Sequence, residues 1–284
     1  MIRLVSGDAI AEFDLVGAEP KRWFAGGKER LWTPSPEYWW PDIAPNLFPI
    51  CGAVRDATIQ VDGIAYPMPI HGFAPTMPFE LVEQSADRAV FRLEDNADTR
   101  KHYPFAFRLD VVYTLSADAL REELVVTNRG DVPLPYAVGV HPGFATGVLE
   151  QNVWTLRFDE QEADRVPTIA TGGIFTSETR SVPFEGKKLP LSSEIFAPGA
   201  FCFLDAASKG VALVDETGGG VRVLLEDMPH IVLWTKPGAP YVCIEGWTGH
   251  GDPAGFEGDL KDKPSMRFLD RGASATHAAT YTIL

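Results

Sequence analysis

One acidic residue stands where a carboxylate is costly to place. Glu245 lies within Tyr241-Val-Cys-Ile-Glu-Gly-Trp-Thr-Gly249, a strand-like run that is otherwise apolar. Burying a carboxylate costs several kcal/mol unless it is paired or protonated. Burial also raises its pKa toward the range that suits a general base. The alternative is an edge strand that leaves Glu245 in solvent.

Two histidines stand beside prolines that restrict the backbone. His141 lies in Gly139-Val-His-Pro-Gly-Phe144, and Pro142 cannot continue an interior ladder, so we expect this imidazole at a strand end. His71 lies in Pro69-Ile-His-Gly-Phe-Ala74, where Gly72 leaves space beside the ring because it has no side chain. Taken alone, either histidine is equally compatible with a structural role held by local hydrogen bonds.

Aromatic residues near these groups suggest a class of ligand. Trp247 follows Glu245 by two positions, so both share one face if the strand continues. Aromatic rings stack on the C–H faces of sugars, and the pair therefore suits a carbohydrate. Trp39-Trp40 either lines a site or forms a buried hydrophobic cluster.

The elements that must position these residues are short strands. Glycine and proline are spread along the chain as turn signals, and no segment keeps a helical apolar period. Such spacing is typical of an all-β sandwich or barrel. We predict a single domain over residues 1–284 with little helix. The predicted strands are Phe107–Leu115, Leu120–Thr127, Tyr136–His141, Val153–Phe158, Phe201–Asp205, Val211–Asp215, Val221–Glu226, Ile231–Thr235, Tyr241–Glu245 and Ala279–Leu284.

Composition limits the partners. The formal charge of −14 disfavours nucleic acid and anionic membranes, and a neutral small molecule fits better. Three distant cysteines, Cys51, Cys202 and Cys243, indicate reduced thiols, and the start of the chain lacks a signal peptide, so we expect a cytoplasmic protein. The sequence shows no phosphate loop, nucleophile elbow or metal-ligand spacing, and we expect no metal and no cofactor.

Five segments in order resemble the aldose 1-epimerase (galactose mutarotase) family, especially its bacterial LacX-like branch. Together they span most of the chain. The segments are Asn46-Leu-Phe-Pro-Ile-Cys-Gly52, Tyr66 leading to His71-Gly-Phe-Ala74, Tyr103-Pro-Phe-Ala-Phe107, Gly139-Val-His-Pro-Gly-Phe144 and Cys243-Ile-Glu-Gly-Trp-Thr-Gly249.

The resemblance implies a large antiparallel β-sandwich with a sugar in a groove on one sheet. It implies that Glu245 is the base that deprotonates the C1 hydroxyl, that His141 is the acid that protonates the ring oxygen, and that His71 hydrogen-bonds the sugar. Proton transfer of this kind needs pKa values near neutrality. We expect His141 and Glu245 to face one cavity about a pyranose ring apart, with His71 on its wall.

The chain also departs from the family pattern. An arginine usual in relatives is replaced by Ala53, another by Pro75, and the proline usual after the glutamate is Gly246. The family's substrate-contacting aspartate cannot be placed around Ile195–Asp205. Arg55 stands two positions after Ala53 and is a possible replacement. The candidate substrate-binding residues are Arg55, Phe73 and Trp247.

Three functions follow from these observations. The first is an aldose 1-epimerase acting on a free sugar. The second is a hexose-6-phosphate 1-epimerase, for which Arg55, Arg100 and Lys101 are the candidate phosphate ligands. The third is a carbohydrate-binding protein that has lost turnover. The sequence does not distinguish a monomer from a homodimer, nor does it identify the sugar.

Overall fold

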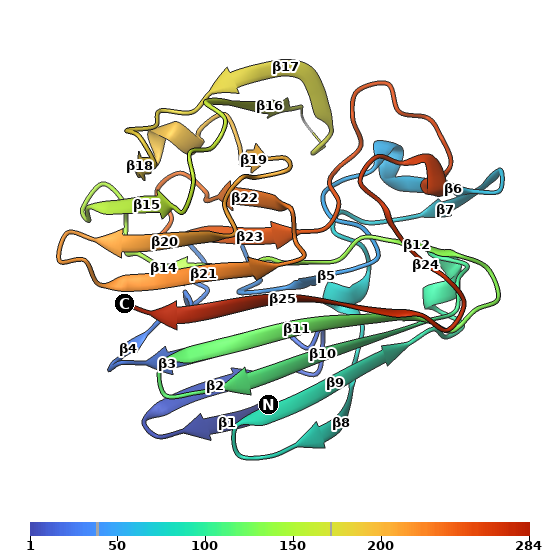
Figure 1. The fold of residues 1–284 in the computed structure, drawn as a ribbon, viewed down its shortest axis with the longest axis horizontal. Helices are drawn as coiled ribbons and strands as arrows, with labels where there is room; N and C mark the ends of the chain where they lie inside the picture. The colour runs from blue at the N-terminus through green and yellow to red at the C-terminus, as the bar shows by residue number, and fades with distance from the viewer. Residues whose placement is uncertain (38–39, 171) are drawn as a thin grey trace.

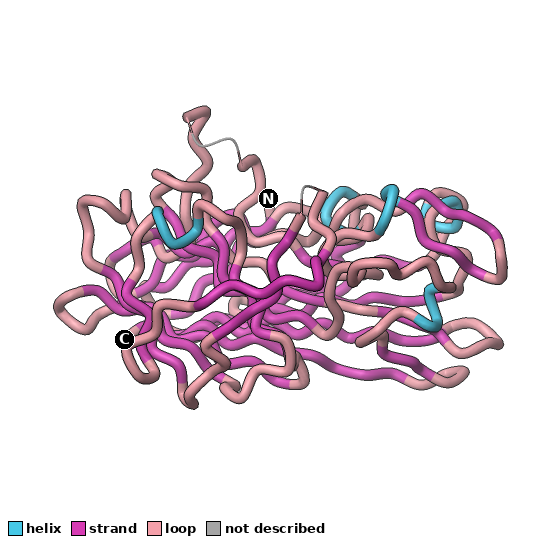
Figure 2. Tube along the Cα trace, turned by 90° about the horizontal axis from the view of Figure 1, so that it is seen from above, coloured by secondary structure: helices cyan, strands magenta, loops and turns pink. Residues whose placement is uncertain are grey.

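The fold is built almost entirely from antiparallel strands. A computed structural model describes residues 1–37, 40–170 and 172–284. Within those residues no helix is long and apolar enough to cross a bilayer. The helices that it contains are single 3-10 turns in connecting segments (Figure 2), namely η1 (Arg55–Ala57), η2 (Ala74–Thr76), η3 (Thr99–Lys101), η4 (Glu194–Phe196) and η5 (Leu260–Asp262). The predicted all-β class is confirmed.

A nine-stranded antiparallel sheet forms one layer (Figure 1). Its strand β11 (Ala119–Asn128) alternates buried and half-buried side chains over most of its length, so that Leu120, Glu122 and Leu124 point inward. The strands in spatial order are β18 (Lys188–Pro190), β15 (Trp154–Phe158), β20 (Gly210–Asp215), β21 (Gly220–Glu226), β25 (Ser274–Ile283), β11 (Ala119–Asn128), β10 (Phe107–Leu115), β9 (Arg88–Glu94) and β8 (Glu80–Gln84).

A second sheet packs on the first and carries the candidate site. Every residue of its strand β23 is buried, so both faces of that strand are covered. A Cβ on Gly246 would lie 2.5 Å from the Leu225 side chain of β21, and glycine therefore lets the two layers approach closely. In spatial order the sheet contains β19 (Phe201–Phe203), β22 (His230–Trp234), β23 (Tyr241–Trp247), β13 (Gly139–Val140) and β5 (Asn46–Leu47), and β14 (Gly143–Ala145) also pairs with β23.

Smaller sheets surround these two layers. A four-stranded sheet contains β1 (Ile2–Ser6), β2 (Ala9–Phe13), β3 (Pro20–Ala25) and β4 (Lys28–Glu29). Three two-stranded sheets pair β12 (Leu134–Tyr136) with β24 (Arg267–Leu269), β16 (Arg165–Ile169) with β17 (Phe175–Ser181), and β6 (Thr58–Val61) with β7 (Ile64–Pro67). The buried apolar side chains form one connected cluster through the molecule.

The predicted strand Tyr136–His141 is wrong as a single element. Its first residue ends β12, which pairs with β24, while Gly139–Val140 forms β13 in the site-bearing sheet. Between them Ala137 donates its backbone N–H to the Pro49 carbonyl and Val138 donates to the Thr248 hydroxyl. These bonds to a loop and a side chain replace a ladder, so the chain changes sheets here.

Candidate active site

A cavity of about 680 Å³ lies over one face of the sheet formed by β19, β22, β23, β13 and β5. His71, His141, Glu245 and Trp247 all line it. The other described lining residues are mostly apolar or glycine: Trp40, Asp42, Pro45, Gly52, Ala53, Ile70, Ile169, Ala170, Gly173, Phe175, Ala197, Pro198, Gly199, Ala200, Cys202, Val232, Trp234 and Gly251.

Glu245 is fully buried on interior strand β23, which excludes the solvent-exposed edge position. Its Oε2 atom accepts a hydrogen bond of 3.0 Å from the indole N–H of Trp247. The two side chains share a face, as the strand alternation predicts. Burial raises the pKa of Glu245 well above 4.5, and the Trp247 hydrogen bond opposes this shift only in part. No described residue hydrogen-bonds the other carboxylate oxygen, Oε1.

His141 lies just after β13 and extends toward the same carboxylate. Its Nε2 atom lies 3.2 Å from Glu245 Oε2, and its side chain is 8% exposed. Burial, together with the nearby His71, lowers the pKa of His141 well below 6.5. Among the described residues, no side chain or backbone group meets hydrogen-bond geometry with its buried Nδ1 atom.

The predicted separation of His141 and Glu245 is wrong. We expected the width of a pyranose ring between them, and His141 Nε2 and Glu245 Oε2 are instead only 3.2 Å apart. Two groups in contact still suit one sugar edge, because the C1 hydroxyl and the ring oxygen are attached to the same carbon. Glu245 and His141 can therefore reach the C1 hydroxyl and the ring oxygen from the same side of the sugar.

His71 completes the polar end of the cavity. Its ring lies 5.4 Å from the His141 ring and 5.5 Å from the Trp247 ring. The backbone N–H of Gly52 donates to His71 Nδ1 at 3.2 Å, so the proton of the neutral imidazole is on Nε2. Burial lowers the pKa of His71 to about 4. At neutral pH this side chain is therefore a neutral N–H donor.

Backbone contacts fix His71 in a left-handed conformation with φ of +65°. Its N–H donates to the Gly52 carbonyl, and its own carbonyl accepts from Phe48 N–H. Gly72 follows at φ of +78°, where a Cβ would lie 2.0 Å from the Phe48 carbonyl oxygen. Glycine is therefore needed because two backbone segments approach closely at this position. We expected Gly72 to make room for the imidazole, and the close backbone approach is a different reason.

Three tryptophans surround the acid–base groups. The Trp40 ring lies 5.2 Å from the His141 ring and meets Trp234 edge-on at 5.4 Å. Trp247 both lines the cavity and orients Glu245. Such faces stack on sugar C–H groups. Of the Trp39-Trp40 pair, Trp40 lines the cavity, and Trp39 lies outside the described residues.

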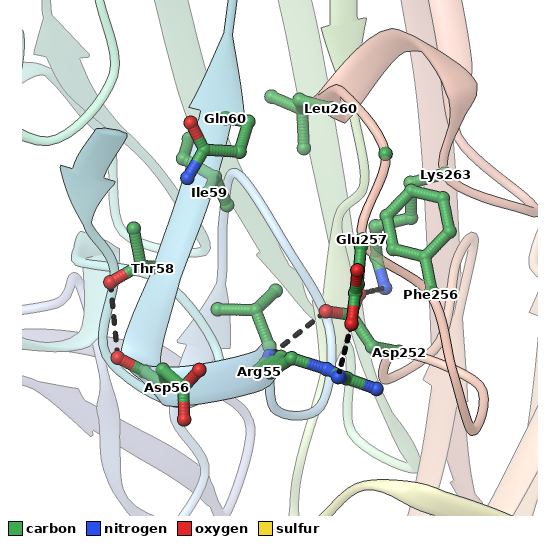
Figure 3. A pocket seen from close by; sticks show the side chains of 12 residues that line it. Arg55, Asp56, Thr58, Ile59, Gln60, Asp252, Phe256, Glu257, Leu260 and Lys263 are labelled. Carbon is green, nitrogen blue, oxygen red and sulfur yellow. Dashed lines mark hydrogen bonds and ion pairs between the residues drawn. The ribbon is translucent and has the colours of Figure 1, made fainter. Parts of the chain in front are cut away.

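Two predicted substrate-binding residues do not reach this cavity. Phe73 is buried against Phe48 and Phe107 in the core. Arg55 lines a separate depression of about 420 Å³, where it forms an ion pair with Glu257 at 3.0 Å (Figure 3). Its backbone N–H donates to the buried Asp252. The sequence could not show that Arg55 points away from the cavity that Ala53 lines. Two positions along a loop are enough to direct a side chain to a different part of the surface.

Two departures from the family pattern have different consequences. Ala53 lines the cavity, whereas Pro75 lies against Gly17 and outside the lining. One lining carboxylate, Asp42, was missed by sequence reasoning, because it follows Pro41 in a loop without strand or helix periodicity. Burial and the nearby Glu19 raise the pKa of Asp42. All three cysteines are free, as predicted.

Fold and site together define an all-β protein with a buried histidine–glutamate pair in a cavity on one sheet. The family described as aldose 1-epimerase matches residues 1–281, and the chain belongs to that family. It is 32% identical to Protein LacX of Lactococcus lactis subsp. lactis, in both its plasmid and chromosomal forms, over 253 residues that cover 84% of each chain.

Solved structures share the whole fold. A galactose mutarotase-like protein from Lactobacillus casei superimposes with a TM-score of 0.93 at 25% identity, and each chain is covered completely. A galactose mutarotase related enzyme from Lactobacillus acidophilus gives a TM-score of 0.88 at 26% identity, covering 100% of this chain and 97% of that one. The galactose mutarotase-like β-sandwich is thereby confirmed.

Proposed function

We propose that this protein is an aldose 1-epimerase that interconverts the α and β anomers of a free sugar. The observation that carries the proposal is the 3.2 Å contact between His141 Nε2 and Glu245 Oε2 on the floor of a cavity large enough for a monosaccharide. Family membership supports the same reaction class. We also propose that residues 1–284 act as one domain, which the connected hydrophobic core supports.

The proposed reaction moves two protons at one edge of the sugar. Glu245 removes the proton from the C1 hydroxyl while His141 delivers a proton to the ring oxygen, and the bond between C1 and the ring oxygen breaks. The open-chain aldehyde turns about its C1–C2 bond. Reversal of both transfers closes the ring on the other face of the carbonyl. His71 donates its Nε2–H to the sugar near the reacting centre.

The charge state of the pair suits this exchange. Burial raises the pKa of Glu245 and lowers that of His141, and both shifts favour a proton on Glu245 over one on His141 in the free protein. The form that reacts has this proton on His141, so the proton crosses the 3.2 Å contact before the ring opens. After ring opening it is on Glu245, and the pair still holds one proton. No net charge enters or leaves the buried site at either step.

The phosphorylated-sugar alternative lacks a receptor in this cavity. Its described lining contains no lysine or arginine. Arg55 lines the other depression, Arg100 pairs with Asp95, and Lys101 pairs with Asp98. A phosphate dianion needs convergent cationic donors. We therefore propose a free sugar as the substrate.

Anomer exchange measured by NMR tests the proposed function. Freshly dissolved α-glucose, α-galactose and their deoxy analogues should reach anomeric equilibrium faster with the protein than without it. If the protein accelerates none of them but binds them saturably in calorimetry, it is a carbohydrate-binding protein without turnover. If it neither binds nor accelerates any, the proposal fails.

A further inference from the structure

The floor of the cavity changes from polar to apolar along one row of side chains. Cys202 on β19 pairs with Val232 on β22, which pairs with Glu245 on β23. All three line the cavity, and His141 lies beyond Glu245. Neighbouring strands are about 4.8 Å apart, so Cys202 lies about 10 Å across the floor from the catalytic carboxylate.

The walls near Cys202 are also apolar. They contain Ile169 at the end of β16, which packs near β19, and the segment Ala197–Ala200. Phe175 at the start of β17 lies in the same lining. Of the described residues at this end, none presents a charged or amide side chain to the cavity. Cys202 carries only a thiol, which is a weak hydrogen-bond donor.

Several backbone groups in these walls are already bonded elsewhere. Arg180 donates to the carbonyls of Gly199 and Ala200 at 2.7 and 2.9 Å. Its side chain lies over the Phe201 ring at 3.9 Å, which holds the guanidinium in place. On the other wall, the Gly173 N–H donates to the Ala170 carbonyl. A sugar hydroxyl placed here would lose water without gaining a strong partner.

The polar groups gather at the opposite end. His141 lies 3.2 Å from Glu245 there, its ring lies 5.4 Å from the His71 ring, and the Trp40 ring lies 5.2 Å from it. Asp42 also lines the cavity. With C1 and the ring oxygen at Glu245 and His141, a pyranose that lies along this row of side chains places its opposite edge, C3–C4, over Val232 and toward Cys202. A hydroxyl buried there without a partner is destabilising.

We propose that the preferred substrate is a deoxy aldose that lacks a hydroxyl group at C3 or C4. This inference rests on the proposed epimerase function and adds a substrate class to it. Sugars with hydroxyls at both positions remain substrates, because an apolar pocket rejects an added hydroxyl by no more than about 100-fold.

The test compares sugars that differ by one hydroxyl. Anomer exchange is measured by NMR for glucose and for its 2-, 3- and 4-deoxy analogues, each relative to its uncatalysed rate. We expect kcat/KM for the 3- or 4-deoxy sugar to exceed that for glucose by about 10- to 100-fold. The 2-deoxy sugar should show no such gain, since C2 lies next to the reacting carbon at the polar end.

The results distinguish failure of the proposed substrate class from failure of the proposed epimerase function. If glucose matches or exceeds both the 3- and 4-deoxy sugars, the substrate class is overturned while the epimerase function stands. If the 2-deoxy sugar gains as much as the others, the preference does not come from the C3–C4 edge and the inference fails. If no sugar is accelerated, the proposed function fails and the inference fails with it.

A substitution in the cavity floor tests whether the preference for a deoxy sugar arises at Val232. Val232→Thr replaces a methyl group with a hydroxyl and should lower the preference for the deoxy sugar severalfold. Val126→Thr is the matched control, because Val126 is fully buried on β11 and does not line the cavity. It should reduce stability but leave the preference unchanged. An unchanged preference in folded Val232→Thr would show that this floor does not select the substrate.

Discussion

His141 Nε2 and Glu245 Oε2 lie 3.2 Å apart, and both side chains are almost completely buried. Trp247 holds the carboxylate from its own strand, and the His71 ring lies 5.4 Å from the His141 ring. A carboxylate and an imidazole held this close inside a cavity are candidates for proton transfer.

The first prediction concerns the carboxylate. Glu245→Gln keeps the shape of the side chain and removes its basicity, so anomer exchange should slow by about 10²- to 10⁴-fold. The matched control is Glu122→Gln, because Glu122 is also fully buried but hydrogen-bonds Tyr113 and Tyr281 in the core. NMR exchange at saturating sugar, with thermal melts of both proteins, provides the measurement. Equal loss of activity in the two variants would assign the effect to stability.

The second prediction concerns pH. A pair with ordinary pKa values, 4.5 for Glu245 and 6.5 for His141, would hold one proton only between those values. Burial lowers the pKa of His141 and raises that of Glu245, so Glu245 replaces His141 as the group that loses the proton of the pair as pH rises. We therefore expect the alkaline limit of activity to be set by Glu245 and not by an imidazole that titrates at 6.5.

The pH profile is measured as catalysed rate minus buffer rate in each buffer. Polarimetry at constant ionic strength suffices, because both macroscopic limits belong to the pair. A loss of rate centred at the ordinary histidine value of 6.5 would contradict the pairing.

The third prediction separates His71 from the proton-transferring pair. Its Nε2–H is a neutral donor at neutral pH, because burial lowers its pKa to about 4 and Gly52 N–H occupies Nδ1. His71→Phe removes one hydrogen bond to the sugar, worth about 0.5–1.5 kcal/mol, so kcat/KM should fall by about 2- to 12-fold. It also removes the bond from Gly52 N–H, so a thermal melt of the variant separates lost binding from lost stability. Steady-state exchange rates over a range of sugar concentrations measure kcat/KM. A loss as large as that of Glu245→Gln would make His71 a proton-transfer group instead.

Regular strands were the part of the fold that the sequence predicted well. Phe107–Leu115 is found with the predicted bounds, because it is a central strand whose apolar residues pack against neighbours on both sides. Strands β1 to β9 were not predicted. They include two-residue strands such as β5 and the exposed hairpin of β6 and β7, where length or burial is too small to leave a period.

In the candidate site, too, the residues in or beside regular strands were predictable from the sequence and those in loops were not. Glu245 and His141 were recognisable because their polarity is out of place in or beside apolar strands. Asp42, Arg55 and Phe73 lie in loops or single turns, where direction depends on tertiary contacts. Phe73 turns into the core just before η2, and Arg55 opens η1 beside the 252–263 segment. No spacing rule along the chain gives those directions.

The last prediction tests how the loop holds His71. Gly72→Ala places a methyl group 2.0 Å from the Phe48 carbonyl at a φ of +78°. Alanine at such a position should lower the free energy of unfolding by more than about 1 kcal/mol, measured by urea denaturation. Gly63→Ala is the control, because Gly63 has a similar φ of +79° but its Cβ would meet nothing within 4 Å. The difference between the two variants isolates the contact with Phe48, and the same contact sets the position of His71. Gly72→Ala should therefore also lower kcat/KM in the protein that remains folded, whereas Gly63→Ala should not.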